Sequence, residues 1–278
     1  MPDTQIGFGF SSGITALDPP LKWAGGKRWL VPEFANLWNP HRSRRLVEPF
    51  CGAAAITLGI QPARALLNDI NPHLMNFHRW LQRGLTIEMP MEHESGAYYQ
   101  NRDRFNRLAR EKRFDRNGKE LAELFYYLNR TCFNGLCRFN QDGGFNVPFG
   151  KYNQIEYRQD FSTYRNAYLN WLLTAGHYEA LELEPDDFIY ADPPYDGDET
   201  AFTRYAGIPF DWQDQVQLAR WLAEHRGPVV ASNAATSRIV ELYRQLGFGL
   251  SERQVARAIN SKADKRGPVA EMLATRNL

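Results

Sequence analysis

Residues 46–69 have the sequence LVEPFCGAAAITLGIQPARALLND, and this stretch decides the fold. A short apolar run, Leu46–Phe50, is broken by Cys51–Gly52, after which Ala53–Leu58 favours a helix. A second apolar run follows at Ala65–Leu67. This order of strand, turn, helix and strand is typical of the start of a doubly wound parallel sheet, so we expect an α/β fold.

The second half of the chain continues the pattern. Phe188–Ala191 predicts a buried strand, and the turn-rich sequence DPPY follows it directly. The further expected elements are a helix at Gln213–His225, a strand at Pro228–Ser232, a helix at Ser237–Leu246 that ends before Gly247, and a closing antiparallel pair at Arg253–Ile259 and Ala270–Ala274.

The remaining parts of the chain differ in character. Residues 1–20 are rich in Gly, Ser, Thr and Pro, whereas the middle shows helical periodicity and then a hairpin signal at Asn140–Asn146. We therefore expect an N-terminal arm, a catalytic α/β domain in two pieces and one insert between them. Their bounds are 1–20 for the arm, 21–75 and 166–278 for the catalytic domain, and 76–165 for the insert.

Composition excludes several classes of protein. Apolar residues make up 43% of the 278 residues and charged residues 23%, which is an ordinary globular balance. No apolar run approaches the roughly 20 residues of a membrane helix, and the first twenty residues lack a signal-peptide pattern. The three cysteines form no CxxC, so we expect no disulfide framework, no metal site and an intracellular compartment.

The net charge of +1 does not by itself indicate a nucleic-acid partner. Residues 98–151, however, contain eleven Lys and Arg against six Asp and Glu, and the rest of the chain is slightly acidic. A basic insert is compatible with a DNA-facing surface. A solvated helix, such as Arg102–Lys119, explains the same excess equally well.

The segment Asp192–Tyr195 carries the most specific chemistry, because it offers what methylation of the exocyclic amine of adenine requires. That amine is a poor nucleophile since its lone pair is delocalised, and two hydrogen-bond acceptors can polarise it. Asp192 offers one acceptor, and a proline carbonyl held out of the sheet ladder offers the other. Tyr195 can stack on an extruded base. The alternative is a proline-rich turn that Asp192 caps.

Two other segments favour a nucleotide-like cofactor. Gly52 follows a strand and allows close approach of a ligand, and Asp69, seventeen residues further on, can accept from ribose hydroxyls. The missing GxGxxG argues against a nicotinamide cofactor. Upstream, Trp23 offers a stacking face and Lys27 a cation, although an ordinary surface loop has the same composition.

The segments Asn129–Phe139 and Phe145–Lys151 suit contact with DNA. Asn134–Gly135 is a turn signal, and Arg138 can contact a guanine in a bidentate manner. Aromatic side chains here can wedge into an unstacked base step, namely Phe133, Phe139 and Phe149. An ordinary hairpin with inward-packed aromatics is the alternative.

Together these residues resemble the Dam-type (D12 class) adenine-N6 DNA methyltransferases. The resemblance runs in order from about Pro20 to Asn277, through PLKWAGGK, LVEPFCGAAA, LNDINPHL, YYLNRTCFNGLCRFN, GGFNVPFGKY, FIYADPPY, FTRYAG, VVASNA and VARAINSKADKRGPVAEMLATR. It implies a Rossmann-like S-adenosylmethionine-dependent methyltransferase sheet with a helical target-recognition insert and a β-hairpin. The implied reaction is methyl transfer to N6 of a flipped adenine in duplex DNA, with GATC as the site.

The resemblance also implies roles for particular residues. The catalytic residues would be Asp192, Pro193 and Tyr195. The cofactor contacts would be Trp23, Lys27, Glu48, Phe50, Gly52, Asp69 and Asp192. The DNA contacts would be Lys22, Phe133, Leu136, Arg138 and Pro148.

The chain departs from the family pattern at two places. The family usually has a second glycine in the cofactor turn where this chain has Ala54, and the stretch between Tyr195 and Phe202 is short. Contacts of Tyr178 or Glu179 with the cofactor's adenine rest on a looser alignment.

Other functions remain to be weighed against this one. Related motifs serve RNA adenine and protein glutamine methylation, but Asp192 in place of Asn disfavours glutamine, and the Arg138 hairpin favours duplex DNA. A catalytically idle DNA-binding relative is disfavoured by intact Asp192, Lys27 and Asp69. The expected partners are double-stranded DNA and a companion restriction endonuclease, and we expect no contact with a membrane. A monomer is the default oligomeric state. The expected location is the nucleoid in the cytoplasm of a bacterium, unless a phage encodes the protein.

Overall fold

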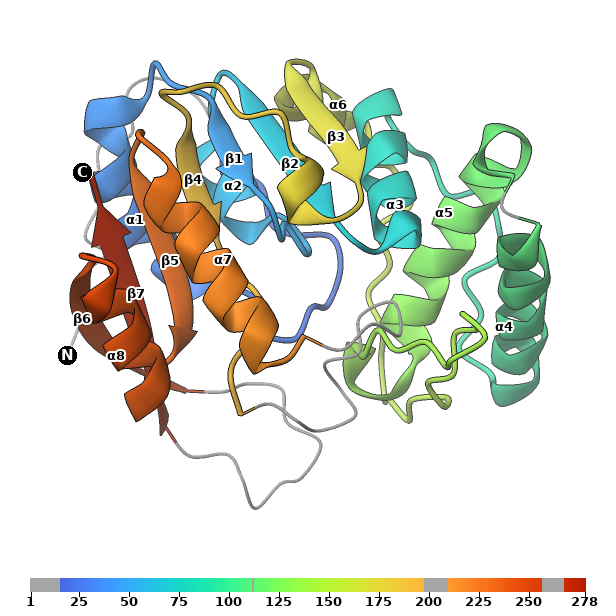
Figure 1. The fold of residues 1–278 in the computed structure, drawn as a ribbon. Helices are drawn as coiled ribbons and strands as arrows, with labels where there is room; N and C mark the ends of the chain where they lie inside the picture. The colour runs from blue at the N-terminus through green and yellow to red at the C-terminus, as the bar shows by residue number, and fades with distance from the viewer. Residues whose placement is uncertain (1–15, 112, 198–209, 257–267) are drawn as a thin grey trace, which may run out of the picture.

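The computed structural model describes residues 16–111, 113–197, 210–256 and 268–278 (Figure 1). The strands of this part are β1 (Leu46–Glu48), β2 (Ala65–Asp69), β3 (Trp171–Ala175), β4 (Phe188–Ala191), β5 (Val229–Ala234), β6 (Gly249–Ala256) and β7 (Pro268–Arg276). They form one sheet in the order β3-β2-β1-β4-β5-β7-β6. β1 to β5 pair in parallel and β7 pairs antiparallel with β5 and β6, which confirms the expected doubly wound, Rossmann-like α/β fold.

Helices cover both faces of the sheet and extend beyond one edge (Figure 1). They are α1 (Val31–Trp38), α2 (Ala55–Ile60), α3 (Pro72–Arg83), α4 (Ser95–Arg110), α5 (Phe114–Thr131), α6 (Ser162–Tyr168), α7 (Trp212–Glu224) and α8 (Ser237–Gln245). Short 3₁₀ turns are η1 (Arg28–Leu30), η2 (Asn39–His41), η3 (Phe133–Gly135) and η4 (Tyr178–Ala180). Within the described ranges, no helix combines the length and the apolar character that a membrane crossing requires.

The protein has two hydrophobic cores, one on each face of the sheet, and the alternating side chains of β4 contribute to both. The rings of Phe188 and Tyr190 pack against Phe34 of α1, with centroids 5.6 and 5.0 Å apart. Ile189 and Ala191 point to the opposite face, where they join the apolar side of α7 and α8. Because all of these side chains are buried, each contributes to holding the central strand, and the burial of a large apolar side chain stabilises by about 1.5–3 kcal/mol.

Most expected elements are present, with some differences. The strand at Phe188–Ala191 has the expected bounds, and the closing antiparallel pair is confirmed, although β6 already begins at Gly249. The single helix considered over Arg102–Lys119 is wrong, because α4 ends at Arg110 and α5 begins at Phe114. The edge strand β3 was not predicted.

The region between β2 and β3 contains α3, α4, α5, a hairpin and α6. Residues 75 and 165, at which we predicted the limits of the insert, lie inside α3 and α6. The predicted hairpin has only isolated antiparallel bridges, Cys132–Phe149 and Phe139–Phe145. Asn106 of α4 fastens it, since the N–H of Phe145 donates to its Oδ1 at 2.7 Å.

Several expectations lie on residues that the structure does not describe. They concern most of the N-terminal arm, the FTRYAG segment and the end of the strand predicted to reach Ile259. The described end of the arm is fixed, because the N–H of Leu17 donates to the carbonyl of Leu58 at 3.2 Å and Asp18 pairs with Arg28 at 2.6 Å.

Candidate active site

Three of the segments singled out in the sequence meet at the carboxyl edge of the sheet. β1, β2 and β4 are parallel neighbours, so the segments that follow them leave the sheet on the same side. These segments are Pro49–Ala54, Asp69–Asn71 and Asp192–Tyr195. Open α/β sheets bind their ligands at this edge, next to the point where the strand order reverses, which here lies between β1 and β4.

Asp192 is the first residue after β4, and two side chains hold its carboxylate. Its Oδ2 lies 3.0 Å from Nζ of Lys27, and its Oδ1 accepts a hydrogen bond of 2.7 Å from Oγ of Ser232 on β5. Lys27 is buried, and its Nζ also donates to the carbonyl of Gly25 at 2.7 Å. Because the Asp192 side chain is 21% exposed, it is an oriented acceptor that solvent and ligands can reach.

The two proline carbonyls next to Asp192 differ in their availability. Nε2 of Gln215 donates to the Pro194 carbonyl at 2.7 Å, and Nδ2 of Asn233 donates to Oε1 of Gln215 at 2.8 Å. Oδ1 of Asn233 in turn accepts from the N–H of Asp196 at 3.2 Å. The Pro193 carbonyl differs from that of Pro194, because the part of the chain that is described supplies no hydrogen bond to this oxygen.

The turn Asp192–Asp196, which we call the acceptor corner, is also fixed by side chains of β7 and α8. The hydroxyl of Tyr195 donates to Oε2 of Glu271 at 2.9 Å, and Nζ of Lys27 lies 4.8 Å from the centroid of the Tyr195 ring. Asp196 accepts from the guanidinium of Arg238, which lowers its pKa although burial opposes this effect. The whole turn after β4 is therefore held by side chains from other elements.

The turn after β1 approaches its neighbours closely. The N–H of Gly52 donates to Oδ2 of Asp69 at 3.2 Å. Gly52 has φ +48°, and a Cβ there would lie 2.7 Å from Nε1 of Trp23, so the position requires glycine. Ala54, at which the resemblance leads us to expect a second glycine, has φ 55°, and this left-handed conformation costs about 1–2 kcal/mol for a residue with a Cβ.

A buried histidine that the sequence analysis missed supports this turn. Nε2 of His78 lies 2.8 Å from the carbonyl of Gly52, and its Nδ1 lies 2.8 Å from the hydroxyl of Tyr168. Burial lowers the pKa of His78 to about 4, so the ring is neutral. Since a carbonyl can only accept, Nε2–H donates to Gly52 and Nδ1 accepts from Tyr168.

Two buried carboxyl groups lie behind the turn. Glu48 accepts from the N–H of Thr57 at 2.9 Å and from its hydroxyl, and it thereby fastens α2 beneath the turn. Burial raises the pKa of Glu48 to about 8, and the nearby Asp192 adds to this rise. Burial raises the pKa of Asp69 to about 6, although the N–H groups of Asn71 and Gly52 oppose the rise.

These features fit the S-adenosylmethionine that the resemblance implies. The glycine turn allows close approach of a ligand, and Asp69 stands where it can accept from ribose hydroxyls. An adenine ring needs a flat apolar surface. The ring of Phe50 offers one such face and has two aromatic neighbours, Tyr178 at 5.4 Å with a tilt of 44° and Phe210 at 5.9 Å and nearly perpendicular.

Lys22 connects the active-site corner to the hairpin of the insert. Its N–H donates to Oδ1 of Asn129, and Nδ2 of Asn129 donates back to its carbonyl, both at 2.8 Å. A Cβ on Gly135 would lie 2.4 Å from Cβ of Lys22, so the two segments are in close contact. Nζ of Lys22 stands 4.0 Å above the centroid of the Tyr152 ring. Because Lys27 follows five residues later, one short segment joins both sets of candidate residues.

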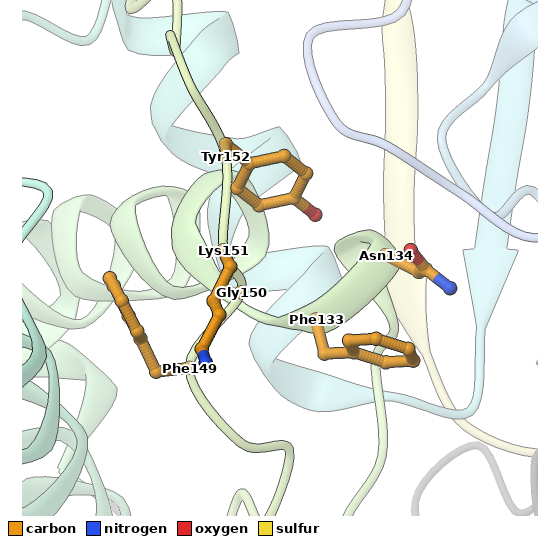
Figure 2. Close-up of a pocket in the computed structure, with 6 residues that line it drawn as sticks. All are labelled: Phe133, Asn134, Phe149, Gly150, Lys151 and Tyr152. Carbon is orange, nitrogen blue, oxygen red and sulfur yellow. The ribbon is translucent and has the colours of Figure 1, made fainter.

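The hairpin presents a cavity of about 280 Å³ beside an exposed aromatic ring (Figure 2). The lining residues are Phe133, Asn134, Phe149, Gly150, Lys151 and Tyr152. Phe133 is 41% exposed, and its N–H donates to the carbonyl of the exposed Pro148 at 2.9 Å. Phe139 is buried against His73, so it cannot act as the surface wedge that the sequence suggested.

The other two predicted DNA contacts lie on the same hairpin. Nε of Arg138 donates to Oδ1 of Asn146 at 2.8 Å, and its Nη2 donates to the Asn146 carbonyl at 3.2 Å. These bonds hold the guanidinium across the hairpin. Leu136 is nearly buried, at 9% exposure. The structure therefore gathers four of the five predicted DNA contacts on residues 133–148, with Lys22 attached to them.

Comparisons with known proteins identify the family of the chain. The family model for D12 class N6 adenine-specific DNA methyltransferases matches residues 23–259. The chain is 36% identical to a DNA adenine methylase of Vibrio cholerae over 91% of this chain and 94% of that protein. It is 31% identical to a type II methyltransferase of Lactococcus lactis, over 93% of this chain and 95% of that protein. It is 32% identical to a DNA N-6-adenine-methyltransferase of Escherichia phage P1, over 91% of this chain and 34% of that protein. The chain therefore belongs to the D12 class of N6 adenine-specific DNA methyltransferases.

Proposed function

We propose that this chain transfers the methyl group of S-adenosylmethionine to N6 of an adenine extruded from duplex DNA, with GATC as its preferred site. The observation that carries the proposal is the acceptor corner at the carboxyl edge of the sheet. There the Asp192 carboxylate and the Pro193 carbonyl, to which no residue in the described ranges donates a hydrogen bond, are adjacent in the chain and lie next to the glycine turn after β1.

The corner is suited to activate an aromatic amine. Asp192 accepts one N–H of the adenine amine and the Pro193 carbonyl accepts the other, so the nitrogen lone pair becomes available. The N6–methyl bond forms as the sulfur–methyl bond of the donor breaks, and N6 then releases a proton. The two acceptors stabilise the positive charge that develops on N6, and the Tyr195 ring stacks on the base. Extrusion is needed because N6 is inaccessible inside the duplex stack.

Seven residues are proposed to hold the methyl donor. They are Trp23, Lys27, Glu48, Phe50, Gly52, Asp69 and Asp192. Asp69 accepts from the ribose hydroxyls, and Phe50 with Tyr178 flanks the adenine ring. Glu48 acts by fixing α2 beneath the turn, and Lys27 acts chiefly through its ion pair with Asp192.

The pKa of Asp69 predicts how cofactor affinity depends on pH. The ionised carboxylate accepts from both ribose hydroxyls, whereas the protonated form loses acceptor capacity. Because the free protein has a pKa of about 6 at Asp69, affinity for S-adenosylmethionine is expected to rise from pH 5 to pH 7. Titration calorimetry in this range measures it. Asp69→Asn is the control, which should bind more weakly and show no rise; equal wild-type affinity at pH 5 and pH 7 would reject the role.

Sequence recognition is proposed to rest on the hairpin and on Lys22. Lys22 and Arg138 contact guanines, Leu136 and Pro148 contact neighbouring bases, and Phe133 enters the base stack. The support is that four of these residues lie on one hairpin to which Lys22 is attached, and that the exposed Phe133 ring lines a cavity there (Figure 2), whereas Leu136 is largely buried. Phosphate contacts by lysine and arginine should also make affinity fall with salt.

Arg138→Ala is expected to relax the choice of site more than it slows methylation of the preferred site. A bidentate contact to a guanine contributes about 1–3 kcal/mol of discrimination, so selectivity at one position should fall roughly 5- to 150-fold. Modification-aware sequencing of a methylated library with randomised sites measures this ratio. Arg104→Ala, which removes an exposed ion pair with Glu120 on α4 and α5, is the matched control and should keep the selectivity. Unchanged selectivity in Arg138→Ala would remove this residue from recognition.

The cellular setting is proposed on the same basis. The similar proteins come from bacteria and a phage, so we propose action on the bacterial nucleoid or on phage DNA, as a monomer. A companion restriction endonuclease is proposed because one of the similar proteins is a type II methyltransferase.

A further inference from the structure

Glu271 lies at the acceptor corner, although no role was predicted for it. β7 runs antiparallel to β5, so the start of β7 lies at the same edge of the sheet as the carboxyl ends of β4 and β5. Glu271 stands near that start, opposite Ala234 at the end of β5. A side chain far along the sequence from Asp192 is thereby brought into the same site.

The contacts of Glu271 link it to both sides of the corner. Its Oε2 accepts the hydroxyl of Tyr195 at 2.9 Å and lies 4.0 Å from Nζ of Lys27. Nζ of Lys27 is also 3.0 Å from Oδ2 of Asp192, so the lysine stands between the two carboxylates. Since a carboxylate can only accept, the Tyr195 hydroxyl is the donor, and its bond fixes the far end of the ring.

Burial makes this arrangement difficult to replace. Glu271 is 7% exposed and Lys27 is 4% exposed, so neither charge is well solvated and both depend on polar partners inside the protein. Burial and the nearby carboxylates of Asp192 and Glu271 raise the pKa of Tyr195, which keeps its hydroxyl protonated as a donor. The ring of Tyr195 is thus held at both ends, by the backbone turn at one and by Glu271 at the other.

We infer that Glu271 is a positioning residue that sets the plane of the Tyr195 ring through its hydrogen bond, so that the extruded adenine stacks in line for methyl transfer. This inference rests on the proposed function, because it assigns Glu271 to the stacking of the target base. Glu271 acts through Tyr195 and does not itself contact the base. A small misplacement of a stacked substrate is enough to slow transfer strongly.

A double-mutant cycle tests the inference. Glu271→Ala and Tyr195→Phe each remove the same hydrogen bond, so each should lower the single-turnover methylation rate by roughly 10- to 100-fold. The double variant should be within about threefold of the slower single variant, because the bond is already lost. Glu271→Gln keeps an acceptor and should stay within about threefold of wild type. Affinities for S-adenosylmethionine and DNA, measured separately, should change less than about twofold in all variants.

Glu252→Ala on the neighbouring strand β6 is the matched control, since Glu252 is exposed and lies opposite Met272 rather than Glu271. If Glu271→Ala fails to fold, Glu271→Met replaces it in the cycle, because methionine fills a similar volume and its thioether is only a weak acceptor. The inference would be overturned if the rate losses of the two single variants multiplied in the double variant. It would also be overturned if Glu271→Gln methylated DNA as slowly as Glu271→Ala. A wild-type protein that transfers no methyl group to duplex adenine would instead reject the proposed function itself.

Discussion

Asp192→Ala is expected to lower the rate of methyl transfer by about 10²–10³-fold, while binding of DNA persists. The reason is geometric. Asp192 is the acceptor that Lys27 and Ser232 orient at the edge of the sheet, and removing it leaves the adenine amine with the Pro193 carbonyl alone. Single-turnover assays with labelled methyl donor measure the rate, and fluorescence anisotropy measures DNA affinity.

Asp192→Asn provides the matched comparison, because it keeps an oxygen acceptor of the same size but loses the charge that faces Lys27. Its rate should fall between those of wild type and Asp192→Ala. Circular dichroism should show that both variants are folded. A fully active Asp192→Ala variant would contradict the proposed role of this residue.

Asp187→Ala should destabilise the fold by about 3–5 kcal/mol without changing the chemistry. Asp187 precedes β4 at the edge of the sheet opposite the active site, and it is completely buried. It accepts from Nε and Nη2 of Arg45 at 2.9 and 2.7 Å, and from the N–H of Glu184 at 2.7 Å. The substitution leaves the largely buried guanidinium of Arg45 without its main partner, and only Glu184 at 3.5 Å and the Glu182 carbonyl at 3.0 Å remain beside the charge.

Chemical denaturation gives the free energy of unfolding for this variant. The control is Arg64→Ala, which removes an ion pair with Glu184 whose side chains are 52% and 41% exposed. Exposed pairs contribute about 0–1 kcal/mol, so the control should stay close to wild type. The rate per folded Asp187→Ala molecule should equal that of wild type at temperatures where the variant is folded. Equal destabilisation by the two substitutions would show that burial of the Arg45–Asp187 pair does not matter.

The fold could be predicted wherever local pattern and burial agree. Phe188–Ala191 is fully apolar and bounded by Asp187 and Asp192, and its bounds were predicted correctly. β3 was missed although it contains the apolar run Trp171–Leu173, because so short a run does not by itself distinguish a strand from a helical segment. As an edge strand it is also partly exposed, with Leu172 at 57%. The break between α4 and α5 was missed because charged residues continue through it.

The candidate site could be predicted only where a motif lies on consecutive residues. Asp192–Tyr195 and the turn at Gly52 were found because strand ends carry a recognisable local pattern. The side chains that fix them come from distant elements, and no local pattern indicates that they face the site. They are Ser232, Gln215, Asn233, His78 and Glu271. Their importance depends on which strands become neighbours, and that order is a property of the folded sheet.

The most direct test of the account is methyl transfer from labelled S-adenosylmethionine to unmethylated plasmid DNA, followed by modification-aware sequencing of the product. The account predicts N6-methyladenine in the DNA, concentrated at GATC. The same mark at another sequence would support the proposed chemistry of Asp192 but reject the proposed recognition of GATC by Lys22 and Arg138. No mark on DNA, in protein shown to bind the methyl donor, would contradict the central claim.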